Sequence, residues 1–418
     1  MSGIFGYFST RDVSAFQEIY FGLYALQHRG QQSVGIATLH EGGIDSHIGR
    51  GQVKRNFAKD WHDDLRGNKG LGFVKYKFRY DTAMPDMPIQ HNGGLLAIDG
   101  IITNPDFTVD ELIAKLETAN VSVIRDYLIS LQGAFTILYM TPEKMIAYRD
   151  IEGIKPLCIG YDKDTAIIAT ESCAFEATNT RFVRDMQPGE LFVHTLLGQT
   201  SYYLSNEEAT VCAFEYVYTA RPDSVIDGRS VYEARYRMGE KLYEENPVDA
   251  DIVIGAPDSG IIAALGYANA SDIEYQQGFI RNNYIGRTFI EMSQAERERG
   301  VTIKLTPIRV NIQNQDIILV DDSIVRGTTI KRIVQNLKDK GANKVHVRIA
   351  APEIVKSNNV TVDIPDEDDL ISANHTIEEM VDIIGCDSLA FLSLGGLHKA
   401  VGTKNLYQDY FLRDEETN

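Results

Sequence analysis

The sequence has few cysteines and no long apolar segment. Its four cysteines, at 158, 173, 212 and 386 of 418 residues, include no Cys-x-x-Cys pair, and we expect them to be buried thiols of a reducing cytoplasm. No apolar run approaches the roughly 18 residues that a membrane helix needs. The N-terminus also lacks the charged-then-apolar profile of a signal peptide. We therefore expect a cytoplasmic protein without a membrane partner.

Positive charge is scarce as well. The chain has 41 Lys and Arg against 59 Asp and Glu, a formal net charge of −18. Nucleic-acid backbones are bound by Lys and Arg gathered over a broad face, so a nucleic-acid partner is not expected. One stretch is locally basic and fits a single small anion: Arg281, Arg287, Arg297, Arg299 and Lys304. For Arg297 and Arg299, a solvated surface position is an equally good interpretation.

A phosphate-binding pattern is present in the C-terminal half. The apolar run 317–320 fits a buried parallel strand, because Asp321 and Asp322 end it at once. Thr328 and Thr329 then open a segment with helical spacing, whose free N–H groups would face an anion. The two carboxylates could hold ribose hydroxyls or Mg²⁺. An ordinary strand–turn–helix with two solvated Asp residues would show the same local pattern.

The segment Ile317–Thr329 resembles the phosphoribosyl pyrophosphate (PRPP) loop of type I phosphoribosyltransferases, in the form found in amidophosphoribosyltransferases. A second strand, turn and helix, beginning at Ile252, resembles the pyrophosphate loop of that family. The resemblance implies that the PRPP-binding residues are Asp258, Ser259, Gly260, Asp321, Asp322, Ser323, Arg326, Gly327, Thr328 and Thr329. It implies that three of them, Ser259, Asp321 and Asp322, are also magnesium ligands.

Residues 278–290 resemble the flexible catalytic loop of the same family, which closes over PRPP and keeps water from the ribosyl centre. The resemblance implies that Arg281, Tyr284 and Arg287 are catalytic. The family more usually has Lys where Arg281 stands, and Arg where Asn283 and Thr302 stand. A planar guanidinium differs from a compact ammonium. The loop therefore predicts PRPP binding more directly than it predicts turnover.

The resemblance to amidophosphoribosyltransferases covers nearly the whole chain, with matching segments at 27–36, 133–137, 171–174 and 212–218. Its N-terminal part resembles the glutaminase domain of this family. In the family an N-terminal Cys attacks the glutamine amide and uses its own α-amine as base. Ser2 stands at that position here. A serine performs this role in other N-terminal nucleophile hydrolases, so the change alone leaves slow glutaminase activity open.

Three further family positions also differ. Lys75 replaces the Arg that clamps the glutamine carboxylate, so bidentate recognition is lost. Asp99 replaces the Asn that precedes Gly100 in the oxyanion hole, and an ionised Asp offers no donor. Asn120 replaces the carboxylate that binds the substrate ammonium. We therefore expect a degenerate glutaminase site made of Ser2, Arg29, Lys75, Asp99, Gly100 and Asn120.

Many members of the family also carry an iron–sulfur cluster. Cys212 matches a usual ligand position, but the other ligand stretches, around 357–361 and 407–410, contain no cysteine. One ligand cannot hold a cluster that requires four. We expect no iron–sulfur cluster.

The chain is long enough for two domains with hydrophobic cores. Residues 1–205 alternate short strands with two expected helices, consistent with the αββα sandwich of N-terminal nucleophile enzymes. In residues 206–418, helices alternate with strands from Ser224 onward, which predicts the parallel sheet of a phosphoribosyltransferase domain. The expected fold is therefore α/β throughout.

The leading hypothesis is a phosphoribosyltransferase that replaces the pyrophosphate of PRPP with ammonia or another amine. It would be a homo-oligomer with Mg²⁺, supplied with ammonia by a separate source. The alternative, from a different class, is a non-catalytic regulatory or assembly protein that senses PRPP or nucleotides.

Overall fold

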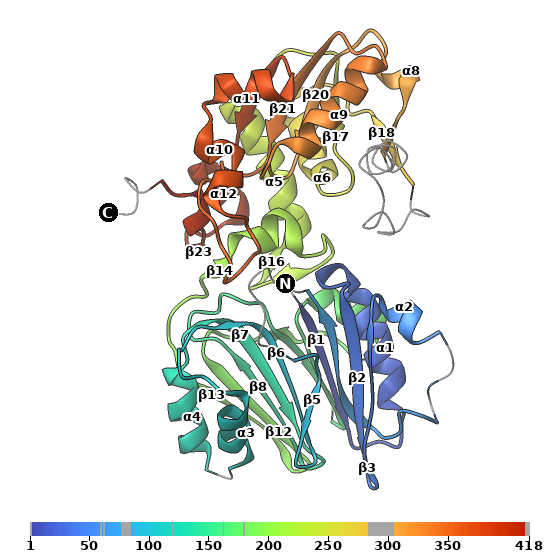
Figure 1. The fold of residues 1–418 in the computed structure, drawn as a ribbon, viewed down its shortest axis with the longest axis vertical. Helices are drawn as coiled ribbons and strands as arrows, with labels where there is room; N and C mark the ends of the chain where they lie inside the picture. Colours follow the sequence, from blue (N-terminus) through green and yellow to red (C-terminus); the bar gives the residue numbers. More distant parts are fainter. Residues whose placement is uncertain are drawn as a thin grey trace.

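The computed structural model describes residues 2–58, 61, 63–76, 85–118, 120–161, 163–178, 180–282 and 305–413. Figure 1 shows two layered units joined near the N-terminus, with the earlier strands in the lower unit and the later strands in the upper unit. The predicted boundary near residue 205 falls between the last strand of the lower unit, β13, and the next strand, β14.

The lower unit contains two antiparallel sheets. The first has seven strands in the order β11-β9-β10-β1-β4-β2-β3, and the second has six in the order β13-β12-β8-β7-β6-β5. The first sheet contains β1 (Gly3–Ser9), β2 (Ser33–His40), β3 (Gly43–Arg50), β4 (Lys69–Lys75), β9 (Cys158–Tyr161), β10 (Thr165–Ala169) and β11 (Arg184–Asp185). The second contains β5 (Ile89–His91), β6 (Gly94–Ile102), β7 (Gly133–Met140), β8 (Lys144–Arg149), β12 (Glu190–Thr195) and β13 (Gly198–Tyr203).

Helices cover the outer faces of both sheets, which gives the αββα sandwich. Helix α1 (Ala15–Ala25) packs on the first sheet, while α3 (Val109–Glu117) and α4 (Val121–Ser130) pack on the second. Besides the short α2 (Val53–Asn56), these are three helices where the sequence predicted two. The additional helix arises because Thr108 and Asn120 each cap a separate N-terminus, by accepting from Glu111 N and Ser122 N.

Strand β1 packs against α1 on one face and against the second sheet on the other. Phe5 and Tyr7 point to α1, whereas Ile4 and Phe8 point between the two sheets. Successive side chains of a strand face opposite sides, so the continuous apolar run of β1 is buried on both faces. This burial places Ser2, at the start of the strand, inside the sandwich.

The upper unit is built on a parallel sheet in the order β17-β20-β21-β22. The strands are β17 (Ile252–Gly255), β20 (Asp316–Asp321), β21 (Lys344–Ile349) and β22 (Ser388–Phe391). One face packs on α5 (Val231–Glu245), α6 (Gly260–Ser271) and α12 (Leu394–Val401). The other packs on α8 (Arg309–Ile312), α9 (Thr328–Asp339) and α11 (Ile377–Ile384). Both faces are covered, as expected for a parallel sheet.

Short elements complete the two units. The lower unit has the helical turns η1 (Gln27–Arg29) and η2 (Ser172–Ala177). The upper unit has β14 (Val211–Cys212), β15 (Val225–Ile226), β16 (Arg229–Ser230), β18 (Phe279–Arg281), β19 (Leu305–Pro307), β23 (Leu406–Tyr407), α10 (Ile371–Asn374) and the helical turns η3 (Glu215–Thr219), η5 (Glu367–Asp369) and η6 (Asp409–Phe411). None of the helices in the described part of the chain has the length and apolar character needed to cross a membrane.

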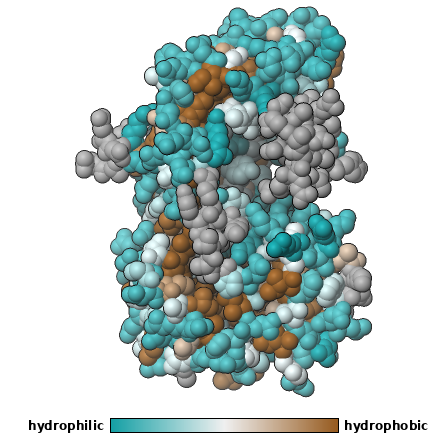
Figure 2. Space-filling model, viewed as in Figure 1, coloured by the Kyte–Doolittle hydropathy of each residue, from teal (hydrophilic) through white to brown (hydrophobic). Residues whose placement is uncertain are grey.

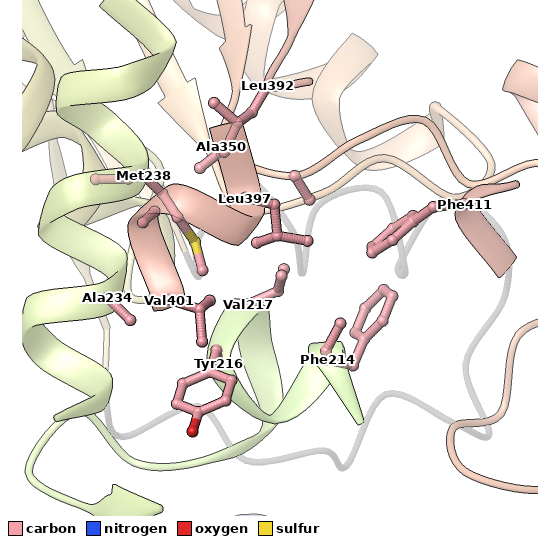
Figure 3. Close-up of a cluster of buried hydrophobic side chains, with 14 of the residues drawn as sticks. Phe214, Tyr216, Val217, Ala234, Met238, Ala350, Leu392, Leu397, Val401 and Phe411 are labelled. Atoms are coloured by element: carbon pink, nitrogen blue, oxygen red, sulfur yellow. The ribbon is translucent and has the colours of Figure 1, made fainter. Parts of the chain in front are cut away.

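A hydrophobic cluster attaches the segment that connects the two units to the parallel-sheet unit. Phe214, Tyr216 and Val217 pack among side chains of α5, such as Met238, and among side chains of α12 (Figure 3). Figure 2 shows that the surface on the same side as Figure 1 is mostly hydrophilic, with separate hydrophobic patches. The apolar side chains of the segment between the two units, such as Phe214, Tyr216 and Val217, are buried inside the molecule and are not part of these surface patches.

Two buried arginines join the units electrostatically. Arg29 donates to both carboxylate oxygens of Glu215, at 2.7 and 2.9 Å, and to Glu171 at 2.5 Å. Arg149 donates to Asp227 at 2.6 and 3.0 Å. Burial acts to lower the pKa of Arg29, but Glu215 and Glu171 outweigh it and raise the pKa well above its ordinary value. Removing one partner of a buried ion pair strongly destabilises a protein, because the other charge is left buried and unpaired.

We predict that Glu215→Gln destabilises the protein strongly. The substitution keeps the shape but leaves the buried Arg29 without its bidentate partner, which costs about 3–5 kcal/mol. Urea unfolding measures the loss. Asp126→Asn is the matched control, because Asp126 pairs with Arg125 at the surface with 69% of its side chain exposed, and it should change stability little. Equal effects of the two substitutions would contradict the proposed importance of the buried pair.

Candidate functional site

Two loops lie side by side at the carboxyl end of the parallel sheet. Strands β17 and β20 are neighbours, with Gly255 opposite Val320, and the loop that follows each strand leads into a helix, α6 or α9. Ala256 N donates to Val320 O at 2.8 Å, directly below the two loops. Ligands of open α/β sheets bind at this edge. The structure therefore brings the two predicted phosphate loops into contact.

Asp321 and Asp322 form the centre of this edge. Asp322 accepts from Ser323 Oγ at 2.5 Å and from Ser259 Oγ of the neighbouring loop, and its backbone N donates to Asp321 at 2.9 Å. Burial raises the pKa of both carboxyl groups, and the charge of Asp322 raises that of Asp321 further. Arg235, from α5, acts in the opposite direction on Asp322. The pair is thus a site of incompletely compensated negative charge.

The donor set at this position fits magnesium. Two carboxylates and the Ser259 hydroxyl converge there, and Mg²⁺ is usually held by one or two carboxylates together with water and substrate phosphates. Among the described residues, no group of three or more His, Cys, Asp or Glu side chains could hold a metal alone. Ser259, Asp321 and Asp322 would therefore bind the ion together with oxygens of a phosphate ligand.

Glycine allows the two loops to approach each other. A Cβ on Gly260 would lie 2.5 Å from Val320 O and 3.0 Å from Asp321 Cα. Gly327 has φ 74° and precedes the first turn of α9, a conformation that favours glycine. In the described structure, no side chain caps the N-terminus of α6 or α9. Their N–H groups can therefore face an anion.

The cations predicted to contact substrate have protein partners. Arg281, at the end of β18, forms an ion pair with Asp258 of the first loop. Arg326 donates to Asp369 at 2.6 Å at the surface. Ser323, Thr328 and Thr329 lie in the second loop and the first turn of α9, as predicted from the sequence. Tyr284 and Arg287, with the rest of 283–304, lie outside the described residues.

A second set of predicted residues gathers around Ser2 in the sandwich. Ser2 N donates to Asp99 Oδ1 at 2.9 Å, and Arg29 Nε donates to Ser2 O at 2.9 Å. Tyr76 N donates to Ser2 Oγ at 3.1 Å. The Ser2 hydroxyl and backbone are therefore held in place by three other segments of the chain.

The remaining predicted pocket residues are placed less centrally. Gly100 follows Asp99 on β6, and Lys75 ends β4 with its Nζ 3.4 Å from Pro85 O and 3.5 Å from Asp86. Asn120 is exposed and caps α4. Among the described contacts, no hydrogen bond links Asn120 to Ser2 or Asp99. The structure thus joins Ser2, Arg29 and Asp99 directly and leaves Asn120 as a helix cap.

Several structurally important residues were not assigned a role from the sequence. Glu171 accepts from Arg29 and from His28 Nε2 at 2.7 Å, and Glu215 binds Arg29 from the far side. Tyr76 Oη donates to Asp363 of the upper unit at 3.2 Å. A signal was present for Glu215, since it is the lone charge in the apolar segment 212–218. A single charge in such a segment is buried only when it is paired.

The four cysteines do not gather at one place: Cys158 and Cys173 share a core cluster of the lower unit, whereas Cys212 and Cys386 belong to two different clusters of the upper unit. Cys158 is in β9, Cys173 in η2 and Cys212 in β14, while Cys386 follows α11, and all four are buried and free. Burial raises the pKa of Cys386 to about 11, whereas metal ligation requires thiolates. This donor set does not fit an iron–sulfur cluster, which needs its ligands at one place.

The whole chain is similar to known proteins. It is 39% identical to an amidophosphoribosyltransferase of Methanocaldococcus jannaschii, over 97% of this chain and 95% of the relative. It is 40% identical to that of Archaeoglobus fulgidus, over 96% and 94%. A solved structure of the glutamine PRPP amidotransferase from B. subtilis, complexed with ADP and GMP, superimposes with a TM-score of 0.86 at 36% identity, covering 98% of this chain and 94% of that one. No family model matches.

We predict that Gly260→Ala weakens binding of inorganic pyrophosphate with Mg²⁺ at least tenfold. The new Cβ would meet the backbone of Val320 and push the two loops apart. Calorimetry measures the affinity, and circular dichroism verifies that the variant is folded. Gly395→Ala is the control, because the nearest atom to its Cβ is Ser393 Oγ at 3.7 Å. Wild-type affinity in folded Gly260→Ala would show that the loops do not form the anion site.

Proposed function

Because the chain belongs to the amidophosphoribosyltransferase family, we propose that it binds PRPP with Mg²⁺ and replaces the pyrophosphate at the ribose anomeric carbon with ammonia or another amine. We further propose that it does not hydrolyse glutamine itself. The observation that carries the first part is the contact between the two loops, with Ser259 of one bonded to Asp322 of the other. The second part rests on Asp99 beside Ser2.

The two loops divide the substrate between them. The N–H groups at the start of α9, with Thr328 and Thr329, suit the 5-phosphate, and those at the start of α6 suit the pyrophosphate. Asp321 and Asp322 lie between these helix ends and can accept hydrogen bonds from the ribose hydroxyls. When bound, Mg²⁺ supplies positive charge that favours departure of the diphosphate.

Positive charge then develops at the anomeric carbon of the ribose. As the bond to pyrophosphate breaks, the diphosphate leaves with the electron pair and the ribosyl centre becomes oxocarbenium-like. Arg281 can exchange Asp258 for the departing diphosphate, because both lie at the pyrophosphate loop. Once Arg281 has turned to the bound diphosphate, its charge stabilises the negative charge that develops on the leaving group and so lowers the barrier.

The sandwich contributes little to glutamine chemistry in this proposal. A developing oxyanion needs donors, and removal of one donor alone costs about 10²–10³ in rate. Asp99 presents a carboxylate that accepts from Ser2 N at 2.9 Å, so it adds negative charge where a donor would be needed. The buried scaffold supports Ser2 but opposes the reaction.

The alternative is a PRPP-sensing protein without turnover. It is favoured by one observation: Arg281 and Arg326, both assigned to substrate, are ion-paired with Asp258 and Asp369. Release of pyrophosphate from PRPP, measured with and without ammonium, separates the two functions. We expect release that depends on ammonium. Binding of PRPP without any release would support the sensing protein.

We predict that Asp321→Asn combined with Asp322→Asn weakens PRPP binding at least tenfold, which is about 1.4 kcal/mol. The carboxylates supply both the ribose contacts and the negative charge for Mg²⁺. Calorimetry with PRPP and Mg²⁺ measures the change. Glu378→Gln combined with Asp382→Asn, two exposed changes on α11 that remove the same charge, should leave the affinity unaltered. Unchanged affinity in the double variant would remove this edge from the PRPP assignment.

We predict no glutamate release from glutamine, with or without PRPP, and none after Ser2→Cys alone. A restored thiol would still face the carboxylate of Asp99. Coupled detection of glutamate tests both proteins, and ammonium-dependent pyrophosphate release in the same preparations shows that the phosphoribosyltransferase half is intact. Efficient, PRPP-stimulated glutaminase activity in Ser2→Cys would disprove the degenerate pocket.

A further inference from the structure

A cavity lies at the end of the lower unit that is away from the N-terminus (Figure 1). It has a volume of about 350 Å³ and lies where β7 turns into β8, beside the C-terminal end of α3. Pockets for small molecules have volumes of this order. Its lining residues are Asn92, Glu117, Tyr139, Thr141, Glu143 and Lys144.

The second sheet separates this cavity from Ser2. Asp99, which accepts from Ser2 N, is opposite Thr136 in the register of β6 and β7, and Tyr139 is three residues further along β7. Successive side chains of a strand face opposite sides of the sheet, so Thr136 and Tyr139 point to different faces. A molecule in the cavity would therefore not contact Ser2.

Tyr139 has a hydroxyl group without a protein partner at this cavity. Only 1% of the residue is exposed, and Oη has no hydrogen bond within the described part of the chain. The hydroxyl group of a buried tyrosine usually has a partner. Gly94 provides the room for this hydroxyl, because a Cβ there would lie 2.7 Å from Oη. A molecule in the cavity can supply the missing partner.

Negative charge surrounds the hydroxyl. Glu117 is the last residue of α3, and Glu143 lies in the turn between β7 and β8. Burial, and then the charges of Glu117 and Glu143, raise the pKa of Tyr139 to about 12, so the hydroxyl keeps its proton. The C-terminal end of a helix adds partial negative charge. The cavity therefore favours a cation that also offers an acceptor to Tyr139.

Each of the two carboxylates has one oxygen available. Glu117 Oε1 is bound to His91 Nδ1 at 3.1 Å, and Glu143 Oε2 accepts from Thr141 Oγ1 at 2.9 Å. The second oxygen of each carboxylate has no hydrogen bond among the residues that the structure describes. Two acceptors at one cavity therefore remain for a ligand with N–H donors.

Lys144 compensates only part of the negative charge. Its Nζ donates to Leu116 O at 2.7 Å and lies 5.9 Å from the centre of the Tyr139 ring. Its one positive charge faces both Glu117 and Glu143. The carboxylates do not suit a metal ion, because no group of three or more His, Cys, Asp or Glu in the described ranges could hold one. An organic cation fits this donor set better.

We propose that this cavity binds a small amino alcohol, a molecule with one primary ammonium group and one hydroxyl group. The ammonium donates to the available oxygens of Glu117 and Glu143, and its three N–H groups suffice for both. The hydroxyl oxygen of the ligand accepts from Tyr139 Oη. The site is independent of the proposed phosphoribosyl transfer, and its tests use neither PRPP nor glutamine.

Titration with 4-aminobutan-1-ol at pH 7 and constant ionic strength is the first test. Its flexible chain can span different separations between the carboxylates and Tyr139. Ligand-observed NMR should show saturable binding that is about tenfold tighter than the binding of 1,4-butanediol, since hydrogen bonds between charged groups are the stronger ones. The diol has the same chain but no charge. Absence of saturable binding, or equal binding of the two compounds, would overturn the proposal.

Tyr139→Phe tests the hydroxyl, because it removes one oxygen atom and keeps the ring in the core. It should weaken binding of 4-aminobutan-1-ol about fivefold without loss of stability in urea, since Oη has no protein partner to lose. Tyr127→Phe on α4 should leave the affinity unchanged. It is the matched control because Lys115 Nζ lies 5.7 Å from the Tyr127 ring, yet Tyr127 does not line the cavity. Wild-type affinity in Tyr139→Phe would overturn the proposal.

Glu117→Gln combined with Glu143→Gln tests the charge. The double variant should bind 4-aminobutan-1-ol no more tightly than 1,4-butanediol. Asp110→Asn combined with Glu111→Gln is the control, because both residues are exposed in the first turn of the same helix and the same charge is removed. The control should retain the preference for the amino alcohol. Equal loss of preference in both double variants would show that the acidic protein attracts the ammonium as a whole, and would overturn the site.

Discussion

The bidentate pair between Arg29 and Glu215 is the interaction on which both halves of the molecule depend. Arg29 follows α1 in the sandwich, and Glu215 opens η3, which packs on α5 beneath the parallel sheet. Arg235 of α5 donates to the carbonyls of Tyr216 and Ala220, so the same turn is held from the other side. Arg29 also holds Ser2 O. One buried guanidinium therefore fixes the start of β1 relative to the unit that carries Asp321 and Asp322.

The phosphate edge could be predicted from the sequence because its information is local. A buried strand, two carboxylates and a glycine–threonine turn stand within the segment 317–329, and each step follows from its neighbours. The strands expected at 317–320 and from Ile252, and the helix expected from Thr328, were found as β20, β17 and α9 for the same reason. The contact between Ser259 and Asp322 was harder to predict from the sequence, since it depends on which strands are adjacent in the sheet.

The sandwich site was predictable as a set of altered positions but not as an arrangement. Asp99 lies 97 residues from Ser2 in the chain, and only the packing of β6 against β1 brings the carboxylate to Ser2 N. Arg326 was assigned to substrate, yet its partner Asp369 comes from a distant acidic turn. The missed third helix depended on two capping residues, Thr108 and Asn120, whose effect is smaller than that of an apolar pattern.

The pairing of β14 with β23 has a consequence for how such proteins diversify. Val211 lies beside Leu406, and the ring of Phe214 stacks on that of Phe411, so the first and the last described segments of the upper unit lie side by side. A unit whose two ends meet can be joined to, or exchanged against, another scaffold with little change in the path of either chain. The sandwich can thus act as a structural support whatever its own chemistry, since the unit above it needs only a fixed point of attachment.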